Sequence, residues 1–258
     1  MPTFDSDGVT IAYTDEGAGP PVLLIHGFAS NKTVNWRATG WVKTLTEAGY
    51  RVITIDNRGH GESQKLYDPE AYKTTLMAAD AARLIDHLGL PRVVAHGYSM
   101  GARITAFLAL AAPEKLAGVI LSGLAGNLVH GVGGGPIAEA LRAPSLESVT
   151  DRNARAFRLF ADQTKSDREA LAACILAARQ TLTVDDLASI TLPTLSVAGS
   201  EDVISGSVDE LVSWLPNATG VTLPGKDHMS AVGDKGHKAA VLDFLSARAA
   251  LSDGWQNP

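Results

Sequence analysis

A serine held between two glycines, where an apolar run meets a helical segment, is the feature that most constrains this chain. The serine is Ser99, flanked at equal distance by Gly97 and Gly101. Residues 92–95 have the apolar, β-branched character of a buried strand, and residues 103–110 that of a helix. A tight turn between the two forces the serine into a sparsely populated backbone conformation, and the glycines remove side chains that would collide. The sequence therefore predicts a strand–turn–helix unit whose serine projects beyond the strand.

Taken alone, this pattern leaves open whether Ser99 caps a helix, belongs to a phosphate-binding loop or acts as a nucleophile. A Gly-x-Ser-x-Gly match arises readily by chance, so the stronger indication of function is its position between a strand and a helix. A serine hydroxyl is also a poor nucleophile until a base removes its proton. A reactive Ser99 therefore needs partners from elsewhere in the chain.

Strand-like runs alternate with helical segments along most of the chain. The strand-like runs are residues 9–13, 22–25, 51–55, 92–95, 118–121, 194–198 and 220–223, and helical patterns include residues 41–48, 71–88 and 100–111. Their continuous apolar character fits strands covered on both faces, which predicts an α/β fold with a mostly parallel central sheet and flanking helices. Asp7-Gly8 is a hairpin signal, so we expect an antiparallel N-terminal strand.

One interval, from residue 124 to residue 192, contains no strand-like run. Two of its segments have cap-like starts, at Asp151 and Ser166, followed by apolar residues at helical spacing. We interpret residues 124–192 as a helical cap inserted into a core formed by residues 1–123 and 193–258. Its candidate pocket-lining side chains are Leu124, Leu128, Val129, Phe157, Phe160, Ile175 and Leu176.

Composition and charge exclude several classes of protein. Hydrophobic residues make up 45% and charged residues 19% of the chain, as in ordinary globular proteins. The net charge of −6, without any basic run, argues against a nucleic-acid partner. The N-terminus lacks the features of a signal peptide, and no apolar stretch reaches the roughly 18 residues of a membrane helix. We therefore expect a cytoplasmic protein without membrane insertion; the sequence leaves its oligomeric state undetermined.

Among the seven histidines, His228 is the candidate base for Ser99, because it follows the last strand-like run and precedes the last helical segment. His26 and His96 lie at strand ends and are expected to be structural. The base needs a carboxylate to orient it, and the loop after residues 194–198 supplies Glu201 and Asp202. Asp202 is preferred for its shorter side chain, and Glu201 is the alternative.

Two backbone N–H groups are also needed to stabilise a developing oxyanion. One is predicted at Met100, directly after the serine at the start of a helix, where the helix dipole adds a favourable field. The other is predicted at Phe28, in the His-Gly-Phe turn after residues 22–25.

These motifs together resemble the α/β-hydrolase fold superfamily. The resemblance rests on residues 97–101, residues 26–28, the DNRGHGES segment at 56–63, and the late aspartate and histidine. It implies a catalytic triad of Ser99, Asp202 and His228, and an oxyanion hole formed by Phe28 and Met100. It also implies that the 56–63 turn is structural. No metal or organic cofactor is called for by this chemistry.

The identity of the nucleophile narrows the reaction, because similar dehalogenases and epoxide hydrolases carry aspartate at the position of Ser99. The sequence therefore predicts a serine esterase acting on small-molecule esters with small, largely uncharged acyl groups. One alternative is a carbon–carbon bond hydrolase, which needs a cationic group for a substrate carboxylate; Arg37 and Arg103 are its candidates, with Arg103 expected on a helix flank. A receptor-like protein with slow turnover is the other alternative.

Overall fold

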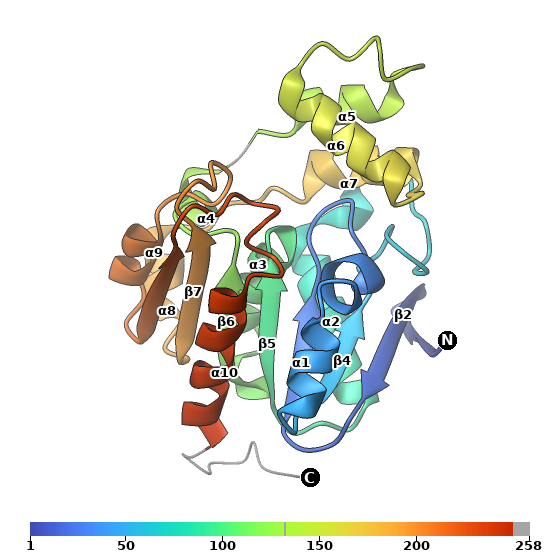
Figure 1. Cartoon of the computed structure of the whole chain (residues 1–258). Coiled ribbons are helices and arrows are strands. Elements are labelled where there is room, and N and C mark those ends of the chain that lie inside the picture. Colours follow the sequence, from blue (N-terminus) through green and yellow to red (C-terminus); the bar gives the residue numbers. More distant parts are fainter. Residues whose placement is uncertain (132, 250–258) are drawn as a thin grey trace.

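An eight-stranded sheet forms the centre of the molecule, with helices on both faces (Figure 1). The structure is a computed structural model that describes residues 1–131 and 133–249. The strands are β1 (Thr3–Ser6), β2 (Val9–Glu16), β3 (Pro21–Ile25), β4 (Arg51–Ile55), β5 (Val93–Tyr98), β6 (Leu116–Ser122), β7 (Thr194–Gly199) and β8 (Ala218–Leu223). Their order is β1-β2-β4-β3-β5-β6-β7-β8. The pairs β1–β2 and β2–β4 are antiparallel and the others are parallel, which confirms the predicted fold class.

The hairpin at the start of the sheet follows from two residues with positive φ. Asp7 and Gly8 have φ of 57° and 81° between β1 and β2, and Ser6 pairs with Val9. Left-handed conformations at both central positions match the twist of the flanking strands. The predicted antiparallel start of the sheet is therefore confirmed.

Alternate side chains of the central strands face two separate apolar layers. Leu23 and Ile25 of β3 pack on the side of helices α2 (Thr74–His87) and α3 (Met100–Ala111), whereas Val22 and Leu24 pack on the side of α1 (Trp41–Glu47) and α10 (Lys235–Ala249). Both layers are apolar, which explains the continuous hydrophobic runs.

The helices are α1 (Trp41–Glu47), α2 (Thr74–His87), α3 (Met100–Ala111), α4 (Asn127–His130), α5 (Gly135–Arg142), α6 (Arg152–Gln163), α7 (Arg168–Ala177), α8 (Val184–Ser189), α9 (Val208–Trp214) and α10 (Lys235–Ala249). None of the helices in the described residues is long and apolar enough to cross a membrane.

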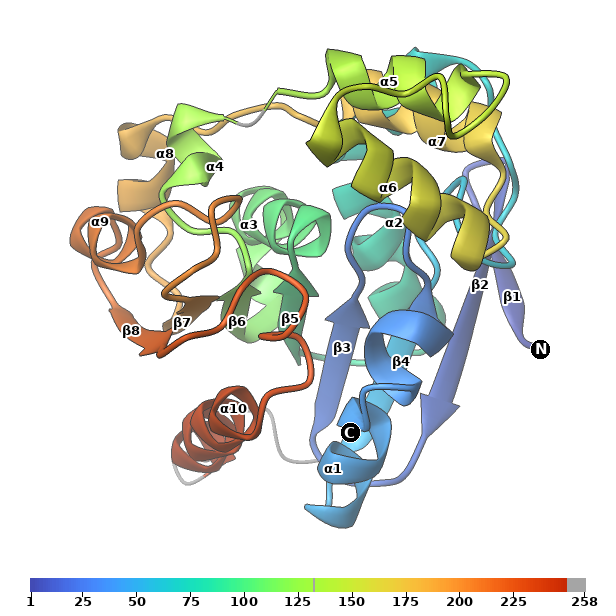
Figure 2. The ribbon, with the colours of Figure 1, turned by 45° about the horizontal axis from the view of Figure 1, so that its top comes forward.

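The chain between β6 and β7 forms helices α4 to α8. Of these, α5, α6 and α7 pack on one another above the carboxyl ends of the strands, and we call these three the cap helices (Figure 2). Helix α8 instead contacts α9, and α4 lies beside this pair of helices in both views (Figures 1 and 2). The predicted core and cap segments include residues 132 and 250–258, which lie outside the described residues.

The starts of two cap helices show how short polar side chains set helix boundaries. Asp151 accepts a hydrogen bond from the N–H of Ala154, as expected for the cap of α6. At α7 the prediction of Ser166 is off by one residue, because Asp167 accepts the N–H of Ala170. The Ser166 hydroxyl pairs instead with that of Thr164, at 2.9 Å. A carboxylate is the stronger acceptor for the free N–H groups of a helix start.

Candidate active site

The turn between β5 and α3 holds Ser99 in a strained conformation. Its φ of 56° and ψ of −114° lie in a region that residues other than glycine rarely adopt. Its N–H donates to the carbonyl of Ser122 on the neighbouring strand, at 2.8 Å. The turn therefore fixes the serine at the carboxyl ends of the parallel strands, beneath the cap helices.

The two glycines around Ser99 are required by close backbone approach. A Cβ on Gly97 would overlap the carbonyl of Gly101, and a Cβ on Gly101 would overlap the carbonyl of Ile25 at the end of β3. Both obstacles are main-chain atoms, which cannot rotate away. The spacing of the glycines is thus set by the tight passage of α3 over two strands.

Three side chains far apart in the sequence form one hydrogen-bonded chain. Nε2 of His228 lies 3.0 Å from Oγ of Ser99, and its Nδ1 lies 2.8 Å from Oδ2 of Asp202. The other oxygen of Asp202 accepts the N–H groups of Ile204 and Ser205, at 2.9 and 3.1 Å. Because that carboxylate can only accept, Nδ1 of the imidazole carries a proton and Nε2 is left to accept the serine proton.

The other carboxylates near His228 make different contacts. Glu201 is exposed, and so is Asp227, which accepts the N–H groups of Met229 and Ser230 within its own loop. The structure therefore brings together the serine, the histidine and the preferred aspartate of the sequence analysis. It does not bring the alternative carboxylate to the histidine.

The loop after β3 lies against the serine. A Cβ on Gly27 would be 3.3 Å from that of Ser99, and the N–H of this glycine donates to Oδ1 of Asn35 at 3.1 Å. The N–H groups of Phe28 and Met100 donate to no other described residue. Phe28 lines the cavities beside Ser99, and Met100 is the first residue of α3. Both N–H groups are thus available to a ligand atom.

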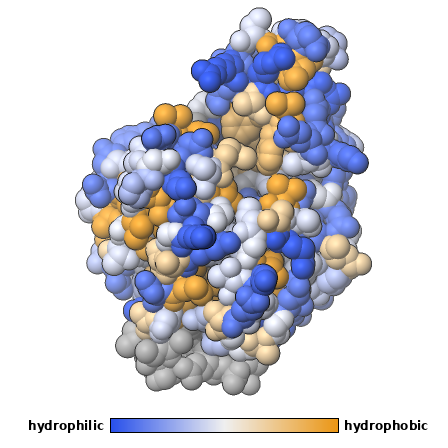
Figure 3. Space-filling view, viewed as in Figure 1, coloured by the Kyte–Doolittle hydropathy of each residue, from blue (hydrophilic) through white to orange (hydrophobic). Residues whose placement is uncertain are grey.

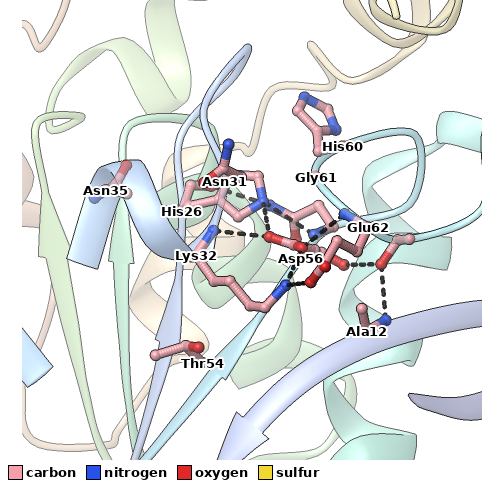
Figure 4. Close-up of polar contacts among 12 residues, drawn as sticks. Ala12, His26, Asn31, Lys32, Asn35, Thr54, Asp56, His60, Gly61 and Glu62 are labelled. Atoms are coloured by element: carbon pink, nitrogen blue, oxygen red, sulfur yellow. Dashed lines mark hydrogen bonds and ion pairs between the residues drawn. The ribbon is translucent and has the colours of Figure 1, made fainter. Parts of the chain in front are cut away.

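A buried carboxylate anchors this loop from below (Figure 4). Asp56 accepts the N–H of Lys32 at 2.7 Å, its ammonium at 2.5 Å and the N–H of Glu62 at 2.9 Å. The same ammonium lies 2.6 Å from the carboxylate of Glu62. A buried charge needs such a set of partners. These contacts agree with the structural role expected for the 56–63 turn, in which Arg58 pairs with Asp80.

Four histidines other than His228 are buried: His26, His60, His96 and His237. Burial lowers the pKa of all four, to about 3 for His60 and about 4 for His237. His26 bonds the carbonyl of Gly27 through Nδ1 and the N–H of Asn57 through Nε2, so it is a neutral structural group. His96 and His237 both bond the hydroxyl of Ser122.

A mainly apolar cavity of about 470 Å³ opens beside Ser99 and His228. Phe157, Leu159 and Phe160 of α6 form one wall, and Figure 3 shows apolar residues gathering where the cap meets the core. Other residues that the sequence analysis missed also line the cavity, namely Val34 and Asn35 of a π-helical turn (Thr33–Arg37) and Ile204, Met229 and Val232 of loops. Loops and so short a helical turn carry no usable periodicity, so no sequence signal could have identified these residues.

A second cavity, of about 40 Å³, lies between α3 and the cap helices α6 and α7 and is also lined by the serine. Its lining residues are Phe28, Ser99, Met100, Arg103, Leu124, Phe157, Ile175, Ala178, Arg179 and Ile204. Two of the predicted lining residues, Leu128 and Val129, reach neither cavity. Leu176 also lines neither and is 49% exposed, because it lies on the outer face of α7.

The two candidate arginines occupy opposite environments. Arg37 lies on the surface, 52% exposed, and pairs with Glu16. Arg103 was expected on a helix flank, but it is buried beneath the cap, where it donates to the backbone carbonyl of Gln180. The segment that follows α7 covers this face of α3. The spacing of apolar residues within α3 does not reveal that a distant segment packs there.

No group of three or more His, Cys, Asp or Glu side chains that could hold a metal ion is found in residues 1–131 and 133–249. The single cysteine, Cys174, is buried and its sulfur lies 3.9 Å from that of Met100. Burial raises the pKa of this thiol, which favours a packing role.

Comparisons with known proteins agree with this architecture. A family profile described as "alpha/beta hydrolase fold" matches residues 20–132. A non-heme haloperoxidase of Rhodococcus erythropolis is 29% identical over 276 aligned positions, covering 94% of this chain and 98% of the relative. A crystal structure of a hydrolase from Pseudomonas aeruginosa PA01 is similar with a TM-score of 0.79 and 27% identity, covering 95% of this chain and 97% of that one. A thermophilic esterase from Thermogutta terrifontis, solved with malate bound, is similar with a TM-score of 0.76, 26% identity and the same two coverages, 95% and 97%.

Proposed function

Because this chain belongs to the α/β-hydrolase fold superfamily, we propose that it is a serine hydrolase that cleaves carboxylic esters through an acyl-enzyme intermediate. The observation that carries the proposal is the hydrogen-bonded chain from Ser99 through His228 to Asp202 beside an apolar cavity. A hydroxyl, a base and an orienting carboxylate in this order are the groups that acyl transfer requires.

In the proposed reaction, Nε2 of His228 takes the proton of Ser99 as Oγ attacks the ester carbonyl. The N–H groups of Phe28 and Met100 donate to the oxyanion of the tetrahedral intermediate. His228 then gives its proton to the departing alcohol, which leaves the acyl group bonded to Oγ. Water, deprotonated by the same imidazole, attacks this ester and releases the acid. Asp202 stabilises the imidazolium in both halves of the reaction.

The larger cavity supports a small and largely uncharged alcohol group. Its volume of about 470 Å³ is within the range of small-molecule sites, and its lining is dominated by apolar side chains of α6 and the adjacent loops. His228 lines this cavity, and the imidazole must reach the oxygen of the departing alcohol. We therefore place the alcohol part of the ester in the larger cavity.

Perhydrolysis is a second candidate, favoured by the similarity to a non-heme haloperoxidase over almost the whole chain. In this reaction hydrogen peroxide replaces water as the attacker of the acyl-enzyme, and a peracid leaves in place of the acid. The same serine, histidine and oxyanion donors would serve both reactions.

The first test is steady-state hydrolysis of p-nitrophenyl esters from acetate to palmitate by the wild type and by Ser99→Ala. We expect turnover by the wild type and a loss of at least about 10³-fold in the variant. Absence of wild-type turnover, or equal turnover by the variant, would overturn the proposal. Repeating the assay with hydrogen peroxide and an organic acid, with bromide oxidation as the readout, separates perhydrolysis from hydrolysis.

A further inference from the structure

We propose that the smaller cavity binds a carboxylate on the acyl part of the substrate, so that the preferred esters are monoesters of short dicarboxylic acids. This inference rests on the proposed ester hydrolysis and names its substrate class. It is carried by the charge, burial and position of Arg103 and by the division of the site into two cavities.

Two arginines, Arg103 and Arg179, line the smaller cavity beside Ser99. Arg103 lies one turn along α3 from the serine, since its N–H donates to the serine carbonyl at 3.2 Å. The residue is buried, with 3% of its surface exposed. Arg179 follows the end of α7 on the cap side of the same cavity. Burial, together with the charge of Arg179, lowers the pKa of Arg103 to about 10. Two cations facing one small cavity favour an anion between them.

Arg103 differs from the other buried arginines in its partners. Arg58 forms an ion pair with Asp80, and Arg158 forms one with Asp162. No aspartate or glutamate among the described residues pairs with Arg103, whose guanidinium donates to the backbone carbonyl of Gln180. A guanidinium has five N–H donors, so most of its hydrogen-bonding capacity remains available to a ligand. Burying such a charge without an acidic partner is costly unless an anion arrives with the substrate.

The positions of the two cavities decide which part of the ester carries the anion. The departing alcohol must lie near His228, and this imidazole lines the larger cavity but not the smaller one. The smaller cavity is lined by Ser99 and by Met100, whose N–H is a predicted oxyanion donor. The acyl chain therefore extends towards Arg103. A volume of about 40 Å³ limits it to a few atoms, as in a malonyl or succinyl group.

A matched pair of substrates tests the charge alone. Monobenzyl succinate and benzyl levulinate share the alcohol and the chain length, but a methyl ketone replaces the carboxylate in the second. Release of benzyl alcohol, measured by chromatography, gives kcat/KM for each ester. We expect the wild type to favour the succinate by about tenfold or more, because a charge-assisted hydrogen bond is lost with the ketone. A wild-type ratio of one or below would overturn the inference.

Variants then assign the preference to Arg103. The succinate-to-levulinate ratio should fall towards one in Arg103→Gln and be retained in part in Arg103→Lys. Arg37→Gln is the matched control, since that arginine lies on the surface, and its ratio should equal that of the wild type. Arg103 also bonds the chain after α7, and a purely structural role would lower activity on both esters in proportion. An unchanged ratio in Arg103→Gln would therefore contradict the inference.

A binding measurement separates this inference from the proposed reaction. Calorimetric titration of Ser99→Ala with the two intact esters requires no turnover. Tighter binding of the succinate by about tenfold, with no hydrolysis by the wild type, would support the anion site and overturn the ester hydrolase. Hydrolysis by the wild type, with equal binding and equal kcat/KM for the two esters, would support the ester hydrolase and overturn the anion site. If Arg103→Gln does not fold, the inference is still tested by the wild-type ratio of kcat/KM for the two esters and by the titration of Ser99→Ala.

Discussion

The imidazole of His228 is oriented by one carboxylate, that of Asp202, at 2.8 Å from its Nδ1. The carboxylate is in turn held by the N–H groups of Ile204 and Ser205, so both of its oxygens have fixed partners. Tyr98 adds a further constraint, because its hydroxyl donates to the backbone carbonyl of His228 at 2.5 Å. The histidine is thus fixed through its ring and through its main chain, with Nε2 directed at Ser99.

This relationship predicts a large effect of Asp202→Asn on catalysis. An amide at this position presents an N–H to Nδ1, which favours the tautomer that protonates Nε2 and so removes the base. We expect kcat/KM for p-nitrophenyl acetate to fall by about 10³- to 10⁴-fold. Glu201→Gln is the matched control, because that neighbour is exposed, and its activity should stay close to that of the wild type. Equal losses in the two variants would assign the effect to the loop and not to Asp202.

The wall that Phe157 contributes to both cavities predicts how the preferred acyl-chain length can be altered. Phe157 lines both cavities and packs on Phe28 with ring centroids 5.8 Å apart. Phe157→Ala removes this wall, so we expect the preferred p-nitrophenyl ester to shift to a longer acyl chain, with lower kcat/KM for the acetate. Leu176→Ala, on the exposed side of the cap, should keep the wild-type profile. An unchanged profile in Phe157→Ala would show that substrates do not reach this wall.

Sequence reasoning was most successful where local chemistry fixes the backbone. The elbow around Ser99 and the hairpin at Asp7-Gly8 were both predicted, since positive φ and close backbone approach demand particular residues there. The positions of His228 and Asp202 followed from their placement after strands of a parallel sheet, whose carboxyl ends share one edge.

The environment of residues on the cap and on α3 could not be predicted in the same way. Arg103 and Leu176 both lie on helices, yet the first is buried and the second exposed, opposite to expectation. Which face of a helix is covered depends on how the cap helices fold back over the sheet. That packing is long-range, and the contact of Arg103 with Gln180 spans 77 residues.

The buried histidines predict a loss of stability in mild acid. Because burial lowers the pKa of His60 to about 3 and of His237 to about 4, both stay neutral in the folded protein, whereas the unfolded chain takes up protons below about pH 6.5. The unfolded state then binds more protons, so the free energy of unfolding is highest above about pH 6.5. It should fall towards pH 4 by about 1.4 kcal/mol per pH unit for each imidazole.

Urea unfolding between about pH 7.5 and pH 5 tests this prediction. His60→Phe should lower the slope of the free energy of unfolding against pH by about one proton. The substitution removes one hydrogen bond, from Nδ1 to the carbonyl of Arg58, whereas Nε2 has no partner; this loss lowers stability at every pH and leaves the slope to report the proton. His130→Gln, at a side chain that is about half exposed, should leave the slope closer to that of the wild type. Stability that rises on acidification would contradict the assignment of neutral buried histidines.

The close passage of α3 over β3 predicts that Gly101 cannot be replaced by alanine. The added Cβ would overlap the carbonyl of Ile25 and lie 2.8 Å from that of His26, and neither main-chain group can move without displacing the oxyanion loop. This overlap outweighs the gain of about 1 kcal/mol in helix propensity. We expect a loss of about 3 kcal/mol or more, which lowers the thermal midpoint by roughly 6–12 °C in a chain of this size. Gly133→Ala is the matched control, with no atom within 4 Å of its added Cβ, and should keep the wild-type midpoint. Equal midpoints for the two variants would mean that α3 can shift away from β3 at little cost, in which case the glycine spacing around Ser99 would need a cause other than steric exclusion.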